Sequence, residues 1–330
     1  MSVADLPKVE LHLHLEGAAP PGFIRGLAAE KRLDISHIFA PDGGYSYRDF
    51  WHFLEVYEAA TSTLKTPEDY HRLTLAVLEE SAGQGVVYCE TFLSPDFCGG
   101  RDLGAWREYL HAIQEAAGIA EARDGIVLRG IVTCIRHFGP EKAKETALCA
   151  AETAGDWLVG FGMGGDERKG KPGDFCYAFD MAREAGLGIT VHAGEWGGAA
   201  SVRDAMVALR PARIGHGVQA IEEPAVVERL AQEQVVLEVC PGSNVFLGVF
   251  PSWEAHPVQT LRDAGVPVTL STDDPPFFKT SLRVEYDRLA ETFGWEAEDF
   301  RQINLAAANA AFCDEETRAR VLKILEAPDA

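Results

Sequence analysis

Two histidines separated by one residue, His12 and His14, are the side chains in this sequence that point most directly to chemistry. They lie in the run Val-Glu-Leu-His-Leu-His-Leu-Glu-Gly at positions 9–17, where leucines alternate with the histidines. Successive side chains of a β-strand point to opposite faces, so both imidazoles would face the same way. Two adjacent imidazoles form half of a metal site, although a pair of hydrogen-bonded core histidines gives the same pattern. The missing ligands would have to come from other strands.

Strands that could position such ligands recur along the chain. Apolar runs alternate with amphipathic helical stretches, and eight of these runs are strand-like: 9–15, 86–93, 126–135, 157–161, 188–192, 213–217, 235–239 and 266–270. This alternation predicts a parallel sheet with right-handed crossovers, and closure as a barrel is its natural form. We therefore expect an α/β fold, a single (β/α)8 TIM-type barrel that forms one domain over residues 1–330. A helical insertion after strand 1, at 20–83, and extra C-terminal helices, at 281–325, would complete it.

Polar clusters follow four of the predicted strands, at the end where barrels of this kind carry their chemistry. The residues concerned are His12, His14, Glu16, His192, Glu195, Arg213, His216, Asp273 and Asp274. Any one cluster could be a capped turn, and the Asp-Asp-Pro-Pro run at 273–276 is typical of a turn or a helix start. Four clusters at one face of a barrel favour a functional site instead.

The ligand types favour zinc. The imidazoles of His12, His14 and His192 and the carboxylate of Asp273 form a nitrogen and oxygen set that suits Zn²⁺ and leaves a position for water. Zinc lowers the pKa of such a water toward neutrality. Glu195 lies three residues beyond His192 and is placed for proton transfer beside the metal. We expect one Zn²⁺ ion per chain, because the fourth strand does not end in a lysine that could bridge two metals.

The residue types alone do not fix the roles of His216 and Asp274. His216, one strand further on, could orient the water or accept its proton. Asp274, next to a predicted ligand, is free to accept a hydrogen bond from a substrate. The role of His137 stays open. The other histidines are interpreted as ordinary surface or packing residues, and they are His37, His52, His71, His111 and His256.

Composition limits the partners and the compartment. The 330 residues carry 30 Lys and Arg against 51 Asp and Glu, a formal net charge of −21 that argues against nucleic acids and anionic membranes. The seven cysteines are scattered, as expected for buried thiols in a reducing compartment. The sequence begins without a basic, apolar leader, and no apolar run approaches 18 residues. We expect a cytoplasmic, soluble protein whose oligomeric state the sequence does not indicate.

Five motifs follow one another in the sequence: PKVELHLHLEG, VHAGE, RIGHG, CPGSN and STDDP. In this order and spacing they resemble the adenosine/adenine deaminase family of the metal-dependent amidohydrolase superfamily, and the resemblance extends from Leu6 to about residue 312. It implies a mononuclear zinc barrel that hydrolyses the 6-amino group of a small purine nucleoside or base and releases ammonia. The H-x-E and P-C-x-x-C signature of the smaller cytidine-type deaminases is absent from the sequence.

The resemblance also assigns roles to individual residues. The implied zinc ligands are His12, His14, His192 and Asp273. The implied catalytic residues are Glu195, which protonates purine N1, and His216, which orients or deprotonates the water. The implied substrate-binding residues are His14, Glu16, Gly165, whose backbone N–H meets purine N3, and Asp274, which engages N7.

Glu16 leaves the choice of substrate open. Adenosine-specific members of the family usually carry aspartate at this position, and glutamate resembles the adenine branch, because one more methylene could occupy the ribose space. In contrast, Gly215-His216-Gly217, Thr272 and the segment 197–204 resemble the adenosine branch. We expect zinc-dependent deamination of adenosine, with 2′-deoxyadenosine as a further substrate, to inosine-type products. The alternative is deamination of adenine to hypoxanthine, or of another 6-aminopurine.

Other interpretations remain. A hydrolase of the same superfamily could act on a non-purine amide or ester, and a catalytically silent barrel could serve as a binding module.

The glycines at 160–165 fit a dinucleotide-binding pattern, but a polar loop follows them where that pattern requires a helix. In the insertion, Phe50, Phe53, Leu54 and Tyr57 recur at helical spacing, which predicts core packing for most of them. The family resemblance implies that this segment covers the mouth of the pocket, so which of its aromatic residues line the pocket stays open.

Overall fold

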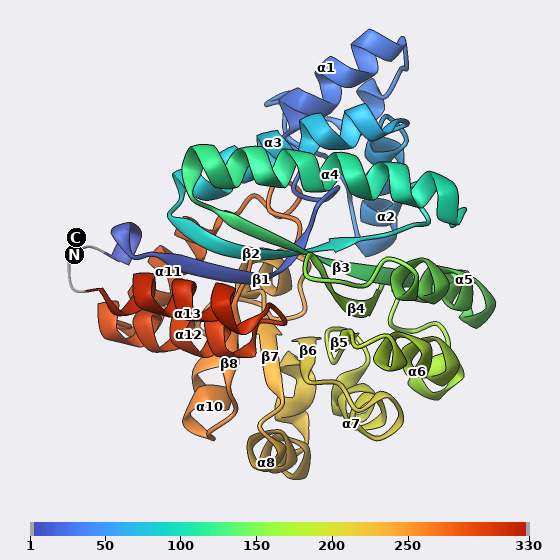
Figure 1. Cartoon of the computed structure of the whole chain (residues 1–330). Coiled ribbons are helices and arrows are strands. Elements are labelled where there is room, and N and C mark those ends of the chain that lie inside the picture. Colours follow the sequence, from blue (N-terminus) through green and yellow to red (C-terminus); the bar gives the residue numbers. More distant parts are fainter. Residues whose placement is uncertain (1–2, 328–330) are drawn as a thin grey trace.

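The computed structural model describes residues 3–327, and within that range one sheet runs through the centre of the molecule (Figure 1). Its eight strands are all parallel and follow one another in sequence order. They are β1 (Lys8–His14), β2 (Val86–Leu93), β3 (Val127–Ile135), β4 (Leu158–Gly164), β5 (Gly188–Ala193), β6 (Arg213–His216), β7 (Val236–Val239) and β8 (Val268–Leu270). The predicted α/β barrel is confirmed, and each predicted strand matches one observed strand.

The two edges of the sheet meet at the C-terminal end of β1. There the backbone N–H of His14 donates to the carbonyl oxygen of Asp273 at 3.1 Å, and the N–H of Asp273 donates to the carbonyl oxygen of His12 at 3.1 Å. A parallel bridge pairs Leu13 with Asp273 at the same point. Barrel closure therefore brings the residue after β8 against the two histidines of β1.

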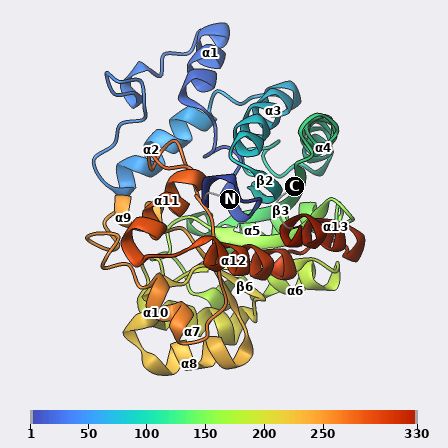
Figure 2. The ribbon, with the colours of Figure 1, turned by 90° about the vertical axis from the view of Figure 1, so that its left-hand side faces the viewer.

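Helices surround this sheet (Figures 1 and 2). Those between the strands are α4 (Leu103–Asp124), α5 (Pro140–Ala151), α6 (Cys176–Glu184), α7 (Gly198–Leu209), α8 (Pro224–Glu233), α9 (Pro241–Phe246) and α10 (Val258–Asp263), with short 3₁₀ turns η3 (Arg136–Phe138), η4 (Pro172–Phe175) and η5 (Val218–Glu222). The insertion after β1 holds η2 (Ser36–Ile38), α1 (Pro21–Lys31), α2 (Phe50–Thr61) and α3 (Pro67–Gly83). The chain begins with η1 (Val3–Asp5) and ends with α11 (Leu282–Phe293), α12 (Ala297–Ala310) and α13 (Glu315–Glu326). The predicted helical insertion and C-terminal helices are thus confirmed.

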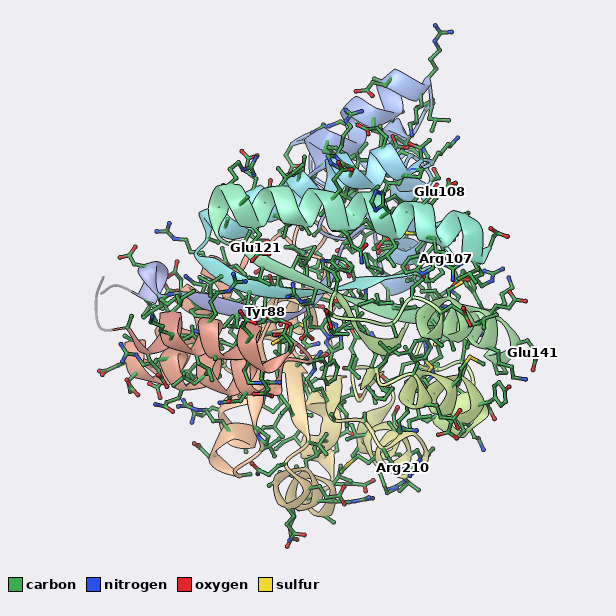
Figure 3. All side chains as sticks on the ribbon, viewed as in Figure 1. Tyr88, Arg107, Glu108, Glu121, Glu141 and Arg210 are labelled. Atoms are coloured by element: carbon green, nitrogen blue, oxygen red, sulfur yellow. The ribbon has the colours of Figure 1, made fainter. Side chains whose placement is uncertain are left out.

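The C-terminal helices bury one side of the barrel. Alanines of α12 and the apolar residues Val321 and Leu325 of α13 pack against Leu11 of β1 and Tyr88 of β2. Figure 3 places Tyr88 between the strands and these two helices, and its side chain is fully buried. Burial of strand faces by helices on the outside explains why the strands read as nearly continuous apolar runs.

Charged side chains lie on the outer helices. Figure 3 labels Arg107, Glu108 and Glu121 on α4 and Glu141 on α5, and all four are exposed or half-exposed. Such side chains account for the acidic surface that the composition predicts. Within residues 3–327, none of the helices combines the length and the apolar character that crossing a membrane requires.

Candidate metal centre and active site

The four predicted metal ligands meet at the C-terminal end of the barrel. The Nε2 atoms of His14 and His192 lie 3.3 Å apart, and each histidine of β1 approaches Oδ1 of Asp273, at 3.5 Å from His12 Nε2 and 3.3 Å from His14 Nε2. One donor atom from each of the four residues lies within 4.8 Å of all the others. The structure therefore brings together the complete predicted ligand set.

The donor atoms fit a divalent metal ion. His12 Nε2 is buried and has no hydrogen-bond partner among the residues that the structure describes. A buried polar atom without a partner is costly, and a bound cation would satisfy it. Three imidazoles with one carboxylate also form a typical open zinc-type site. Gly215 makes room for this arrangement, since a Cβ there would lie 2.7 Å from Cε1 of His12.

Behind the ligands, a buried charge network orients His12. Its Nδ1 donates to Glu238 Oε2 at 2.8 Å, which leaves the lone pair of Nε2 directed at the metal position. Glu238 Oε1 accepts hydrogen bonds from Arg213 Nε at 2.6 Å and from Thr190 Oγ1 at 2.9 Å. Burial raises the pKa of Glu238, but Arg213 and His12 more than compensate and hold it below its usual value. Arg213 in turn pairs with Glu90 at 2.5 Å.

We predict that Glu238→Gln weakens metal binding. The amide cannot supply the charge that holds His12 in its ligating orientation, and loss of such a partner commonly costs about 10- to 100-fold in metal affinity. Chelator competition with Zn²⁺ measures the effect. Glu90→Gln is the matched control, because Glu90 pairs with the same arginine without touching a ligand. An unchanged zinc affinity in Glu238→Gln, or an equal loss in both variants, would contradict this role for Glu238.

Two site residues have left-handed backbone conformations. The φ angles are +69° at Asp273 and +61° at His216, values that residues other than glycine rarely adopt. Such strain persists only where the surrounding structure imposes it, and it gathers at functional sites. Here the barrel-closing hydrogen bonds hold Asp273, whose Oδ2 also accepts a hydrogen bond from Ser243 Oγ at 2.7 Å.

Glu195 follows β5 on a turn that a second carboxylate holds. Glu167 Oε1 accepts the backbone N–H of Gly194 at 2.5 Å, and its Oε2 accepts those of Glu195, Trp196 and Gly197 at 3.0, 2.6 and 2.9 Å. The Glu195 carboxyl is buried, with Oε2 3.8 Å from His216 Nε2. Burial raises the pKa of Glu195 well above its usual value, and the nearby charges of Asp273 and Glu167 raise it further. Burial therefore favours the protonated form of the Glu195 carboxyl group.

A cavity opens over this cluster. It is lined by His14, Glu16, His192, Glu195, His216, Asp273 and Asp274 on its polar side. Its apolar side includes Phe50, Phe53, Leu54 and Tyr57 from α2. The predicted core packing is confirmed, because all four residues belong to the hydrophobic core or pack against it, and all four also line the cavity. Helical spacing identifies the buried face of α2 but not whether that face meets protein or an open site.

Asp274 lines the cavity, and one oxygen of its buried carboxyl group, Oδ1, lacks a hydrogen-bond partner among the described residues. Gly17 allows this close approach, since a Cβ there would lie 1.5 Å from Oδ1. Burial and the neighbouring charges of Asp273 and Glu195 raise the pKa of Asp274 well above its usual value. Depending on its protonation, the group can accept from or donate to a ligand.

Glu16 lies at another part of the wall and is fixed there. Its Oε1 accepts a hydrogen bond from the hydroxyl of Tyr70 at 3.0 Å, and the thiol of Cys98 lies 4.0 Å from the same oxygen. The carboxyl is almost fully buried, and burial raises its pKa to about 7. These contacts hold the carboxyl group of Glu16 at the cavity wall.

Gly165 and His137 border the cavity where β4 ends. Gly165 has φ +93°, and a Cβ there would lie 2.7 Å from Nδ1 of His137. The same nitrogen accepts a hydrogen bond from the backbone N–H of Asp166 at 3.2 Å. A glycine is therefore required at this turn, where its backbone faces the cavity.

The sequence did not single out several residues that support the site. They are Glu167, Glu238, Ser243, Asn244 and His256. Glu238 lies near the end of the predicted strand 235–239, so its position was a usable signal, whereas Glu167 lies in the loop that follows the predicted strand 157–161. His256 is buried, and no pattern in the sequence predicts its contact with Asn244.

A family model described as "Adenosine deaminase" matches residues 7–328. Among curated relatives, "Adenine deaminase" from Rhizobium rhizogenes is 49% identical over 319 residues, which cover 97% of this chain and 98% of that protein. Similar solved structures include adenine deaminase from Arthrobacter aurescens, with a TM-score of 0.87, 28% identity, and coverage of 97% of this chain and 98% of that one. An amidohydrolase from Burkholderia ambifaria with bound Zn has a TM-score of 0.85, 27% identity, and coverage of 96% and 89%.

These comparisons correct the expected substrate. The expectation of adenosine is wrong, because the similar relatives and the similar solved structure carry the name adenine deaminase. In the structure, Glu16 accepts a hydrogen bond from Tyr70 and contributes its carboxyl group to the cavity wall.

Proposed function

The chain belongs to the adenosine deaminase family of hydrolytic purine deaminases, and we propose that it converts adenine and water to hypoxanthine and ammonia. The observation that carries this proposal is the combination in one cavity of a complete ligand cluster, a protonatable Glu195 and a fixed Glu16. A similar chain, 49% identical over nearly its whole length, is named for the same reaction.

His12, His14, His192 and Asp273 would hold the metal ion, and we propose one Zn²⁺ per chain. The ion supplies Lewis acidity, which lowers the pKa of a coordinated water toward neutrality. His14 and Asp273 also line the cavity, so the substrate would lie directly against the ligand cluster.

Glu195 moves the protons in the proposed reaction. Addition of water across the N1–C6 bond places oxygen on C6 and a proton on N1, and Glu195 delivers that proton and takes up the one that the water releases. The C6–N bond then breaks. The amino group leaves as ammonia with the proton of the new C6 hydroxyl, and the C6 carbonyl of hypoxanthine forms. Gly165 and Asp274 would orient the ring through N3 and N7.

The direct test of the proposed chemistry uses metal-free protein and protein reconstituted with Zn²⁺. Only the reconstituted protein is expected to convert adenine to hypoxanthine with one ammonia released per ring. Liquid chromatography identifies the purine, and a coupled assay measures ammonia. Equal activity in the metal-free protein would reject the role of the ligand cluster, and no conversion in either form would reject adenine as the substrate.

Glu16 is proposed to select the free base. Adenine carries an N–H on its five-membered ring, and in adenosine the ribose replaces that hydrogen. A fixed carboxyl group at the wall of the cavity can accept this N–H and leaves no room for the sugar. A hydrogen bond to a charged acceptor contributes about 1.5–3 kcal/mol, which is enough for strong discrimination.

We predict that Glu16→Asp narrows the preference for adenine. Shortening the side chain by one methylene withdraws the acceptor from the base and opens space, so the ratio of kcat/KM for adenine to that for adenosine should fall by about tenfold or more. Steady-state kinetics with both substrates measures this ratio. Tyr70→Phe is the companion variant, because it releases Glu16 without shortening it and should move the ratio in the same direction by less. An unchanged ratio in Glu16→Asp would remove Glu16 from substrate selection.

Three finer assignments are also proposals. We propose that zinc, with one ion per chain, is the native metal, that residues 1–330 form one catalytic domain, and that the enzyme acts in the cytoplasm on a small purine base.

A further inference from the structure

One ring nitrogen of His216 faces the active site, and the other contacts a chain of buried hydrogen bonds through Asn244, His256 and the backbone of Val258, here called the relay. Its Nε2 lies 3.8 Å from both Glu195 Oε2 and Asp273 Oδ2. Its Nδ1 contacts the side-chain amide of Asn244 at 3.2 Å. Whether His216 accepts a proton from water or donates a hydrogen bond to the attacking oxygen depends on which nitrogen carries the hydrogen.

The relay begins at a backbone N–H group, which can act only as a hydrogen-bond donor. The N–H of Val258, at the start of α10, contacts Nδ1 of His256 at 3.2 Å. A backbone N–H can only donate, so Nδ1 of His256 accepts and carries no hydrogen. The hydrogen of His256 is therefore on Nε2, which lies 3.1 Å from the amide of Asn244.

This hydrogen fixes the orientation of Asn244. Nε2–H of His256 needs an acceptor, so the amide oxygen of Asn244 faces His256 and its NH₂ group faces His216. The NH₂ group donates, and Nδ1 of His216 must accept. The three side chains are almost fully buried, which removes water as an alternative partner. His216 is left with its hydrogen on Nε2, directed at the active site.

We infer that Asn244 and His256 are positioning residues that hold His216 as an Nε2–H hydrogen-bond donor. In the proposed deamination, on which this inference rests, His216 donates to the oxygen that adds to C6 and stabilises the negative charge that develops there. Nε2 already carries a hydrogen, so His216 does not take up the proton of the water. That proton passes to Glu195, the carboxyl group 3.8 Å away.

The isosteric variant Asn244→Asp tests this inference because the two possible roles of His216 predict opposite results. A carboxylate opposite Nδ1 would draw the hydrogen to that nitrogen and leave a lone pair on Nε2. We expect kcat for adenine to fall by about 10²-fold or more, as wrong-tautomer histidines do elsewhere. Zinc content and binding of hypoxanthine should stay within about threefold of wild type. An unchanged or higher kcat would show that His216 acts as a base and would overturn the inference.

¹⁵N NMR of histidine-labelled, zinc-reconstituted protein reads the tautomer independently of activity. We expect the hydrogen of His216 on Nε2 in the wild type and on Nδ1 in Asn244→Asp, and the opposite wild-type result would overturn the inference. His256→Gln keeps a donor for Asn244 and should retain kcat, whereas His256→Leu should lower it; equal activity of the two would exclude His256 from the relay. If the wild type converts no adenine, the proposed substrate fails, while the NMR result still decides the tautomer.

Discussion

Replacement of Glu195 by glutamine is expected to lower kcat for adenine by about 10³-fold or more, because the amide cannot deliver a proton to N1. The substitution is isosteric. The turn that carries residue 195 is held through backbone N–H groups by Glu167, so the fold of the turn does not depend on the replaced carboxyl. Zinc content and hypoxanthine affinity should therefore remain close to wild type. Steady-state kinetics and metal analysis on the same preparations measure the effect.

The matched control for this variant is Glu222→Gln. Glu222 is a second carboxylate near the same segment, where it accepts the N–H of Ala199 at 3.3 Å, and it does not line the cavity. Its replacement should leave kcat within about threefold of wild type. Turnover at a near wild-type rate by Glu195→Gln would show that another group protonates the ring, and the proposed acid would have to be abandoned.

Asp273→Ala is expected to abolish both metal binding and turnover. The variant removes a carboxylate that approaches the Nε2 atoms of both His12 and His14, so the three remaining imidazoles lose the charged member of the ligand set. We expect protein that purifies without stoichiometric metal and a kcat/KM at least about 10³-fold below wild type. Inductively coupled plasma mass spectrometry and the deamination assay give the two values.

The left-handed backbone conformation of residue 273 makes a second variant necessary, because alanine also destabilises the fold there. Residue 273 has φ +69°, and alanine in that conformation costs about 1–2 kcal/mol, so the alanine variant also loses some stability. Asparagine tolerates the left-handed region and keeps the shape of the side chain, so Asp273→Asn should melt near the wild-type temperature and still bind zinc weakly. A stable Asp273→Asn protein with full zinc content and full activity would show that the site does not need the negative charge of Asp273.

The sequence predicted the barrel and the central cluster because both follow from local patterns. Alternating apolar runs and amphipathic helices imply a parallel sheet, and parallel strands place all their C-terminal ends at one face. Polar residues that follow the strands, such as His14, His192 and Asp273, must then meet there. Closure between β1 and β8, through the hydrogen bonds of Asp273 with His12 and His14, makes that meeting direct.

Contacts between distant segments could not be predicted in the same way. The four hydrogen bonds that Glu167 accepts depend on how the loop after β4 lies over the turn after β5. The relay from Val258 to His216 runs through side chains that come together only in the folded barrel. The position of Glu16 in the cavity wall likewise depends on a contact with Tyr70, which lies 54 residues away in α3.

Competition between adenine and adenosine tests the central claim most directly. Zinc-reconstituted protein is mixed with equal concentrations of the two compounds, and the formation of hypoxanthine and inosine is followed in the same reaction. The proposed function predicts that hypoxanthine and ammonia accumulate together while adenosine remains unchanged. Faster formation of inosine would contradict both the assignment of adenine as the substrate and the role of Glu16.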